Sequence, residues 1–267
     1  CLWKKYHPKH ITNLYVDNIT YDKLILLDIL YLWDNVEILK YTDRINREIL
    51  WAGCKPKVIS QTKTPMLIVD HDFLIFKNID EHLKDEVIYS YDEDMSQWYI
   101  NSDDEYNKQL TNPIEFVQDK AANVSFLYLP DVNFAIEYGQ QTVDRLTEFT
   151  ALLGDNLNTG YLSACEQYEL KEMLIKSKIK HKTLNQNIYS CNNLKFKEEK
   201  NNIGIWDLKE SFLSYKHYGV DKRNIFDNKK GHKYVESISY LYRCIKASKL
   251  MSIEYLEDKF NKHINNR

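Results

Sequence analysis

The sequence lacks an excess of either charge, cysteine pairs and long apolar runs, and each absence argues against a class of protein. Its 267 residues include 36 basic and 39 acidic side chains, so the basic surface of a nucleic-acid-binding protein is not predicted. Its five cysteines form no Cys-x-x-Cys pair, which argues against a zinc site or disulfide scaffold and for a reducing compartment. No apolar run is long enough to predict a membrane span.

What the sequence does contain is an ordinary globular composition, with 43% hydrophobic and 28% charged residues. No internal repeat, low-complexity linker or sharp change of composition divides it, so residues 1–267 are predicted to form a single domain with a helical extension over 234–267. Strand and helix patterns alternate, which favours an α/β fold with a mixed, mainly parallel sheet flanked by helices.

The expected elements follow from the spacing of apolar residues. Strands are predicted over 13–16, 36–41, 66–69, 86–91 and 123–129, and helices over 21–33, 44–51, 55–62, 132–153 and 159–179. Gly154 is expected to end the first of the two longest helices, and polar capping residues follow it. Residues 92–111 are acidic and polar, which predicts an exposed loop.

The stretch around Asp70 carries the strongest chemical signal. The apolar run Met66–Val69, which follows a proline, indicates a buried strand of the kind found in parallel sheets. Asp70 and Asp72 come next, and in α/β sheets ligands bind beyond the carboxyl ends of the strands. Two carboxylates this close together favour a hard divalent cation between them, whereas the alternative is a solvated strand end.

Two further polar clusters fall at predicted strand ends or loops. Thr42 and Asp43 follow the strand over 36–41, and His217 lies near Gly219 and Lys222 late in the chain. A late histidine can complete a metal site that two carboxylates begin. Gly219 would allow close approach of the backbone to a phosphate, and Lys222 would supply a point charge for it.

The order of these clusters resembles the GT-A glycosyltransferases, in particular a group of small bacterial and giant-virus enzymes. The shared pattern comprises Thr42-Asp43, Trp51-Ala52-x-x-Lys55, Pro65 to Phe76 with its Asp-x-Asp, Asn123, Glu166-Gln167, and His217-x-Gly219-x-x-Lys222. It covers roughly residues 10–225. The sequence departs from the pattern in two places: the His-to-Gly spacing is one residue shorter, and Ser125 stands where the family has a glycine.

The resemblance implies a nucleotide-sugar transferase that is cytoplasmic (in the host cytoplasm, if viral) and requires Mn²⁺ or Mg²⁺. Its donor would be a UDP-sugar or a similar nucleotide-diphosphate sugar, and its acceptor a hydroxyl group of a glycan or other molecule. The roles implied are as follows: Thr42, Asp43 and Lys55 near the nucleotide base; Asp70, Asp72 and His217 on the metal, with Asp70 also near the ribose; Lys222 on a phosphate; Asn123 and Ser125 near the transferred sugar; and Glu166 facing the acceptor.

The acceptor hydroxyl needs a base, for which Glu166 is the first candidate and Asp155 the second. Two other functions remain open at this point. A haloacid-dehalogenase-like phosphatase also places Asp-x-Asp after an apolar strand, and would use Asp70 as its nucleophile. A non-catalytic nucleotide-sugar-binding module would keep the same pocket residues without turnover.

Overall fold

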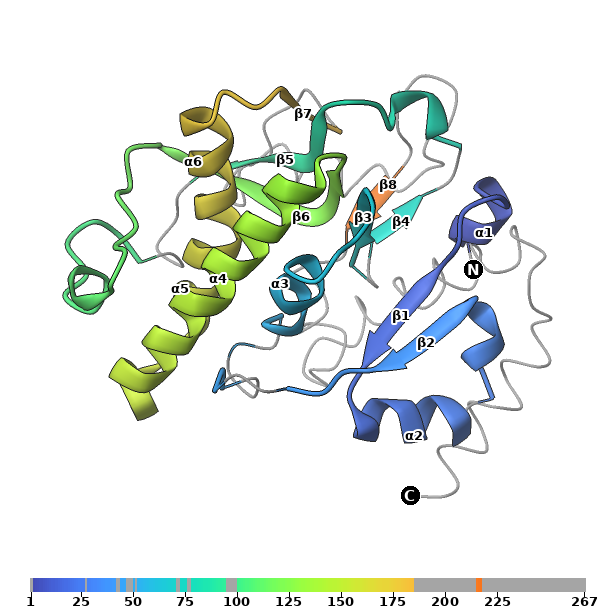
Figure 1. Cartoon of the computed structure of the whole chain (residues 1–267), viewed down its shortest axis with the longest axis horizontal. Helices are drawn as coiled ribbons and strands as arrows, with labels where there is room; N and C mark the ends of the chain where they lie inside the picture. The colour runs from blue at the N-terminus through green and yellow to red at the C-terminus, as the bar shows by residue number, and fades with distance from the viewer. Residues whose placement is uncertain are drawn as a thin grey trace, which may run out of the picture. The chain divides into compact units, whose positions relative to one another are not determined.

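The computed structural model describes residues 2–26, 28–41, 44–46, 50, 52–70, 73–75, 78–94, 100–184 and 215–217 (Figure 1). Side chains are described for all of these except residues 2, 73–75, 94 and 215–217. The predicted site residues Thr42, Asp43, Asp72 and Lys222 lie outside the described part, as does the predicted extension over 234–267.

The chain divides into two compact units, the first of which contains Cys1–Leu39, His71–Asp80 and Ser214–Arg267. Its elements are α1 (Leu2–Tyr6), β1 (Asn13–Val16), α2 (Asn18–Leu26), the 3₁₀ helix η1 (Leu30–Leu32), β2 (Asn35–Ile38), β4 (Phe73–Ile75) and β8 (Tyr215–His217). Strands β1 and β2 pair in parallel, and β4 pairs with β8 in antiparallel orientation. The second pairing places His217 directly opposite Phe73, the residue that follows Asp72.

A buried histidine ties the N-terminal segment of this unit to residues 78–80. His7 is fully buried, stacks on Trp3 with 3.9 Å between ring centroids, and accepts a hydrogen bond from the Ile79 amide at 3.0 Å through Nε2. His10 pairs with Asp80 at 3.0 Å. Burial lowers the pKa of His7, and the opposing effect of Asp80 is smaller. The imidazole therefore accepts at Nε2 as a neutral ring.

The second unit contains Lys40–Asp70 and Glu81–Leu213. Its elements are α3 (Cys54–Ile59), β3 (Met66–Val69), β5 (Val87–Asp94), the 3₁₀ helix η3 (Asn107–Gln109), β6 (Lys120–Leu129), α4 (Val132–Leu153), the 3₁₀ helix η4 (Gly154–Asn156), α5 (Thr159–Ser163), the π-helix η5 (Ala164–Tyr168), α6 (Glu169–Lys176) and β7 (His181–Thr183). The short 3₁₀ helix η2 (Asp80–His82) lies where the two units meet along the chain.

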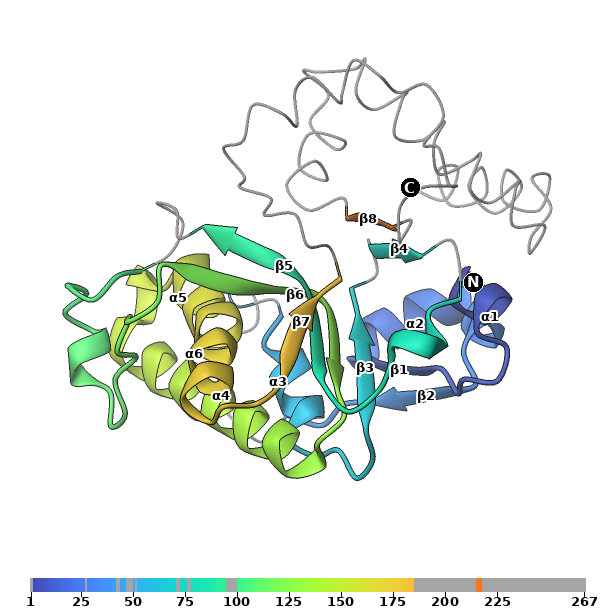
Figure 2. The same ribbon diagram turned by 90° about the horizontal axis from the view of Figure 1, so that it is seen from above.

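The second unit is built on a four-stranded sheet in the order β3-β6-β5-β7. Strand β6 pairs in antiparallel orientation with both β3 and β5, and β5 pairs in parallel with β7. Helices α4, α5 and α6 lie on one face of β5 and β6 (Figure 2). Two buried apolar clusters fill this unit, one around α5 and the end of α4 and the other between α4, α6 and the sheet.

The mixed α/β class is confirmed, but the described strands do not form a mainly parallel sheet. The apolar run Met66–Val69, predicted to be a buried parallel strand, is half-buried and pairs in antiparallel orientation with β6. Strands β5 and β6 are consecutive in the sheet, and the described part of their connection contains only the short η3. Without a helical crossover, consecutive strands return in antiparallel orientation. The single-domain organisation stays a prediction.

Several boundaries differ from the predictions for local reasons. Helix α4 and strand β1 span the predicted residues, and Gly154 ends α4 with φ of 49°. The helix predicted over 21–33 is shorter, because α2 ends at Leu26 and Asp28 takes a left-handed φ of 51°. The helix predicted over 44–51 has no helical residue among its described positions, 44–46 and 50.

Helix α3 crosses α4 with direct backbone contact at Gly139. A Cβ atom at this position would lie 2.4 Å from the Ser60 nitrogen and 2.8 Å from the Pro56 carbonyl oxygen. Only glycine permits this approach, which fixes α3, and with it Lys55, against α4. None of the helices in the described part of the chain has the length and apolar character required to cross a bilayer.

Candidate functional site

Lys55 lies between two carboxylates that come from distant parts of the chain. Its Nζ is 3.0 Å from Asp70 Oδ1 and 2.8 Å from Glu166 Oε1, with a longer contact of 3.5 Å to the Val124 carbonyl oxygen. The three side chains are 13%, 19% and 5% exposed, respectively. A cation shared by two buried carboxylates is strongly held, because each charge has been removed from most of its water.

Asp70 is positioned by the end of β3 and by an irregularity in β6. Its amide donates to the Ser125 carbonyl oxygen at 2.8 Å, directly after the last β3–β6 pair. Between the Tyr89–Leu127 and Tyr91–Asn123 pairs, β5 contributes one residue whereas β6 contributes residues 124–126. This bulge takes the Val124 carbonyl toward Lys55. Bulges of this kind often lie next to active sites, where they redirect groups that a regular strand would keep in the ladder.

The bulge also builds a buried chain of polar side chains across β5 and β6. The Ser90 and Ser125 hydroxyl oxygens are 2.6 Å apart, and Ser125 Oγ donates to Asn123 Oδ1 at 2.7 Å. Asn123 Nδ2 in turn donates to Glu93 Oε2 at 3.1 Å. Ser90, Ser125 and Asn123 are buried, whereas Glu93 is half-exposed. The chain therefore runs from the interior of the sheet to a carboxylate that is partly exposed.

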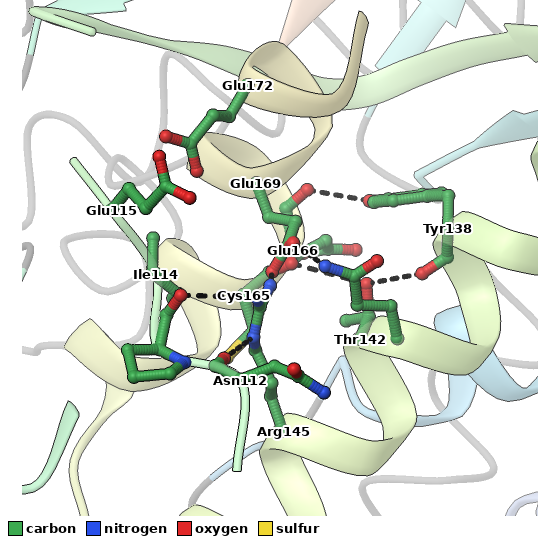
Figure 3. A network of polar contacts seen from close by, with 12 residues as sticks. Asn112, Ile114, Glu115, Tyr138, Thr142, Arg145, Cys165, Glu166, Glu169 and Glu172 are labelled. Atoms are coloured by element: carbon green, nitrogen blue, oxygen red, sulfur yellow. Dashed lines mark hydrogen bonds and ion pairs between the residues drawn. The ribbon is translucent and has the colours of Figure 1, made fainter. Parts of the chain in front are cut away.

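Glu166 is positioned by the π-helix η5, where the helical turn widens between α5 and α6. The wider turn takes backbone carbonyls out of the regular α-helical ladder, and buried carbonyls need partners. Two hydroxyl groups of α4 provide them: Tyr138 donates to the Glu166 carbonyl oxygen at 2.6 Å, and Thr142 donates to that of Cys165 at 3.2 Å (Figure 3). Single π-turns inside helices frequently occur at functional sites.

A second buried cation fixes α4 against the first residue of α6, directly after η5. Arg145 of α4 forms an ion pair with Glu169, and its Nε donates to the Asn112 carbonyl oxygen at 2.7 Å (Figure 3). Gln141 also donates to Glu169. Arg145 and Glu169 are 5% and 2% exposed, so water does not compete with these contacts. This network stabilises the segment that carries Glu166, and among the described residues none of its hydrogen bonds or ion pairs involves Lys55 or Asp70.

Burial and the neighbouring charges set the protonation of the cluster. Burial acts to lower the pKa of Lys55, but Glu166 and Asp70 outweigh it and raise that pKa above its ordinary value, so the amine is charged. Burial raises the pKa of Glu166, and Lys55 partly opposes the rise. The neighbouring Cys165 thiol is fully buried, which raises its pKa to about 12 and makes it an inert packing group.

The structure brings Lys55, Asp70, Asn123, Ser125 and Glu166 together within the second unit, as the predicted site requires. It does not link Asp155, the second candidate base, to them. That residue is exposed in η4, and no described hydrogen bond or ion pair connects it to Lys55 or Glu166. The backbone of His217 is described in β8, but its side chain lies outside the described part.

Sequence reasoning missed three contributors to the site, namely Ser90, Glu93 and Tyr138. Glu93 fell in a segment predicted to be an exposed loop, whereas β5 continues through it to Asp94. Ser90 lies in the middle of a strand, and Tyr138 lies on the core face of a long helix. Only Ser90 could have been suspected from the sequence, because it is a polar residue in an otherwise apolar strand, and such a residue is only a weak indication of a functional site.

Carboxylate oxygens and imidazole nitrogens are ligand types that suit Mg²⁺ or Mn²⁺. Of the expected ligands, Asp72 and the His217 side chain lie outside the described residues. Asp70 is the one expected ligand whose side chain is described, and Lys55 occupies its Oδ1. Among the described residues, no group of three or more His, Cys, Asp and Glu side chains could hold a metal ion.

The chain matches no protein-family model, and no curated protein matches it significantly. The fold and the site therefore define the protein as a mixed α/β protein with a buried Lys–dicarboxylate cluster at the end of a strand.

Proposed function

We propose that the protein is a glycosyltransferase that moves a sugar from a nucleotide-diphosphate sugar, with UDP-sugars as the first donors to test, to a hydroxyl acceptor. The observation that carries the proposal is the cluster of Lys55, Asp70 and Glu166 beside Asn123 and Ser125. These residues come from α3, the end of β3, β6 and η5. They are the described residues to which the GT-A resemblance assigns roles around the donor and the acceptor.

Within this proposal, Glu166 accepts the proton of the acceptor hydroxyl. A general base works best with a pKa near the working pH, and burial raises the pKa of Glu166 in that direction. Lys55 opposes the rise and so favours the ionised carboxylate, the form that can accept a proton. Asp70, held by Lys55 and by its amide bond to Ser125, is positioned on the donor side of the cluster.

The departing nucleoside diphosphate gains negative charge as the glycosidic bond breaks, and groups of fixed positive charge stabilise it. Mn²⁺ or Mg²⁺ held by Asp70, Asp72 and His217 would supply such a charge when bound. Lys222 would add a second positive charge on a phosphate oxygen. These assignments depend on the resemblance, and the requirement for the ion is tested by adding EDTA.

The test measures sugar release and transfer from UDP-, GDP- and CMP-sugars with Mn²⁺ present. We expect turnover of at least one donor, loss of that turnover with EDTA, and loss of it in the Asp70→Asn and Glu166→Gln variants. Asp103→Asn, at an exposed loop position of the same unit, is the matched control and should retain full activity. Full turnover by Asp70→Asn with EDTA present would refute the proposal.

The same preparation separates the other two functions. A phosphatase that uses Asp70 as its nucleophile would form an aspartyl-phosphate that can be trapped with a phosphoester substrate. A non-catalytic module would bind a nucleotide-sugar, visible as thermal stabilisation, without releasing sugar to water. At ligand concentrations about 100 times the dissociation constant, binding stabilises the fold by roughly 2.7 kcal/mol.

A further inference from the structure

We propose that the apolar outer face of α2 is a docking surface, and that its occupant is the segment 238–264 of this same chain. The contact lies within the first unit and does not depend on the proposed function. Its basis is a shortage of buried side chains in that unit. Among the described side chains of the first unit, only three are buried, namely His7, Val16 and Ile79, whereas two buried apolar clusters fill the second unit.

The shortage is clearest in residues 24–33, which include the end of α2. Nine of these ten residues are apolar, a composition typical of a protein interior. None of the described positions in this stretch is buried, and α2 as a whole has no buried residue. Ile19 and Leu26, which lie seven residues apart and therefore on one face of α2, are 68% and 81% exposed. An exposed apolar face of this kind marks an interaction surface.

The charges around this face favour a basic occupant. Residues 17–37 contain five acidic side chains and one lysine. A second copy of the same face would bring like charges together, which disfavours self-association through it. An anionic lipid surface would be repelled for the same reason. The occupant should therefore combine an apolar stripe with basic side chains.

The segment 238–264, which lies outside the described residues, has both properties in its sequence. Its apolar residues recur at the spacing of one helical face, in two runs: Ile238, Leu241 and Ile245, then Ile253, Leu256, Phe260 and Ile264. Residues 238–250 contain no acidic side chain, and their basic side chains recur every third residue, at Arg243, Lys246 and Lys249. An amphipathic helix of this kind presents an apolar stripe with basic residues beside it.

The segment also belongs to the same part of the molecule as α2. Residues 214–267 and α2 fall in one compact unit, and β8, which precedes the segment, pairs with β4 of that unit. Docking would supply the first unit with the apolar burial that its described residues lack. The same unit contains Asp72 and His217, so the contact would also stabilise the part of the chain that carries these two expected ligands.

Hydrogen exchange of the full chain, followed by mass spectrometry, tests the contact from both sides. In the unmodified protein we expect slow exchange of the backbone amides over 238–264. Leu26→Lys should accelerate that exchange about 10- to 100-fold, the factor to which the burial of one leucine side chain corresponds. In the reverse experiment, Leu256→Lys should accelerate the exchange of the α2 amides by a similar factor.

Leu152→Lys is the matched control, because Leu152 is a partly exposed leucine of α4 in the second unit. It should leave the exchange over 238–264 unchanged. Circular dichroism checks that each variant is folded, and Leu26→Ser, a milder change at the same position, gives the same readout if Leu26→Lys does not fold.

Rapid exchange over 238–264 in the unmodified protein would overturn the proposal. Slow exchange there that neither Leu26→Lys nor Ile19→Lys alters would also overturn it, since the segment would then pack elsewhere. Light scattering identifies the remaining occupant. A dimer that Leu26→Lys converts into a monomer, with the exchange over 238–264 unchanged, would assign the face to a second copy of the chain and overturn the proposal.

Discussion

Replacing Lys55 by methionine tests whether the buried cluster is held by its central cation. The substitution keeps most of the side-chain volume but removes the ammonium group that lies 3.0 Å from Asp70 and 2.8 Å from Glu166. Two carboxylates then share a site with little access to water. Removing one partner of a buried ion pair typically costs about 3–5 kcal/mol of the free energy of unfolding. Because Asp70 keeps some contact with solvent, we expect a loss of about 3 kcal/mol for Lys55→Met.

Adding Glu166→Gln to Lys55→Met should restore part of this loss, because it removes the carboxylate that is left buried without its cation. We therefore expect the double variant to be more stable than Lys55→Met by about 1–2 kcal/mol, because substitutions at residues in direct contact are not additive. Lys57→Met is the matched control. It lies on the same helix, and no ion pair is described for it, so its effect should be within about 0.5 kcal/mol.

The loss of stability in Lys55→Met should also depend on pH. Burial raises the pKa of Glu166 above the ordinary 4.5, and Lys55 partly opposes the rise, so the pKa of Glu166 should rise further in Lys55→Met. A carboxyl group with a raised pKa binds its proton more tightly in the folded state. Its folded state therefore loses stability as the pH rises from 4.5 toward the raised pKa. The deficit of Lys55→Met relative to the unmodified protein should be larger at pH 8 than at pH 5.

Urea unfolding followed by circular dichroism at both pH values measures these differences. A deficit below about 1 kcal/mol, or one of equal size at pH 5 and pH 8, would refute the reasoning. Stability greater than that of the unmodified protein would show that the cluster is destabilising for the fold, as active-site charges can be.

Three further predictions address the surrounding structure. Gly139→Ala forces a Cβ into the backbone of α3 and should cost roughly 1–3 kcal/mol or more in urea unfolding. Gly154→Ala, where the added Cβ meets no neighbouring atom, should destabilise the protein only through the strain of a side chain at a φ of 49°. Tyr138→Phe leaves the Glu166 carbonyl without its hydroxyl donor and should lower the free energy of unfolding by about 1–3 kcal/mol in the same assay. An unchanged free energy of unfolding would contradict this prediction and would mean that water replaces the donor. His7 has a lowered pKa, so its contribution to stability is present above pH 6.5 and is lost as the pH falls below that value. The fall in the free energy of unfolding from pH 7 to pH 5, measured by urea unfolding, should therefore be smaller in His7→Gln than in the unmodified protein.

The sequence indicates the elements better than it indicates how they pair. The long amphipathic pattern of α4 and the glycine at its end suffice to predict both ends of that helix. The apolar run of β3, by contrast, carries no information about strand direction, since direction depends on which strand lies beside it. The π-helix has no local signal either, because it depends on the Tyr138 and Thr142 hydroxyls of another helix.

For the site, the motif resemblance selects residues that do lie together, but it does not predict their contacts. Lys55 was expected near a nucleotide base, and its ion pairs with Asp70 and Glu166 join positions that are far apart in the sequence. Glu93 could not be predicted, because an acidic segment is typical of an exposed loop and only the pairing with β6 makes it a strand. Both the ion pairs of Lys55 and the strand conformation of Glu93 depend on contacts between segments that are far apart in the sequence.

The π-helix has the geometry of an α-helix into which one residue has been inserted. A regular α-helix advances about 100° per residue, so a one-residue deletion within Ala164–Tyr168 could restore an unbroken helix from α5 to α6. The same deletion would rotate everything after it by about 100° relative to α5, which moves Glu169 away from Arg145 or Glu166 away from Lys55. A chain shortened by that one residue would therefore gain a more regular helix and lose the arrangement of its two buried cations.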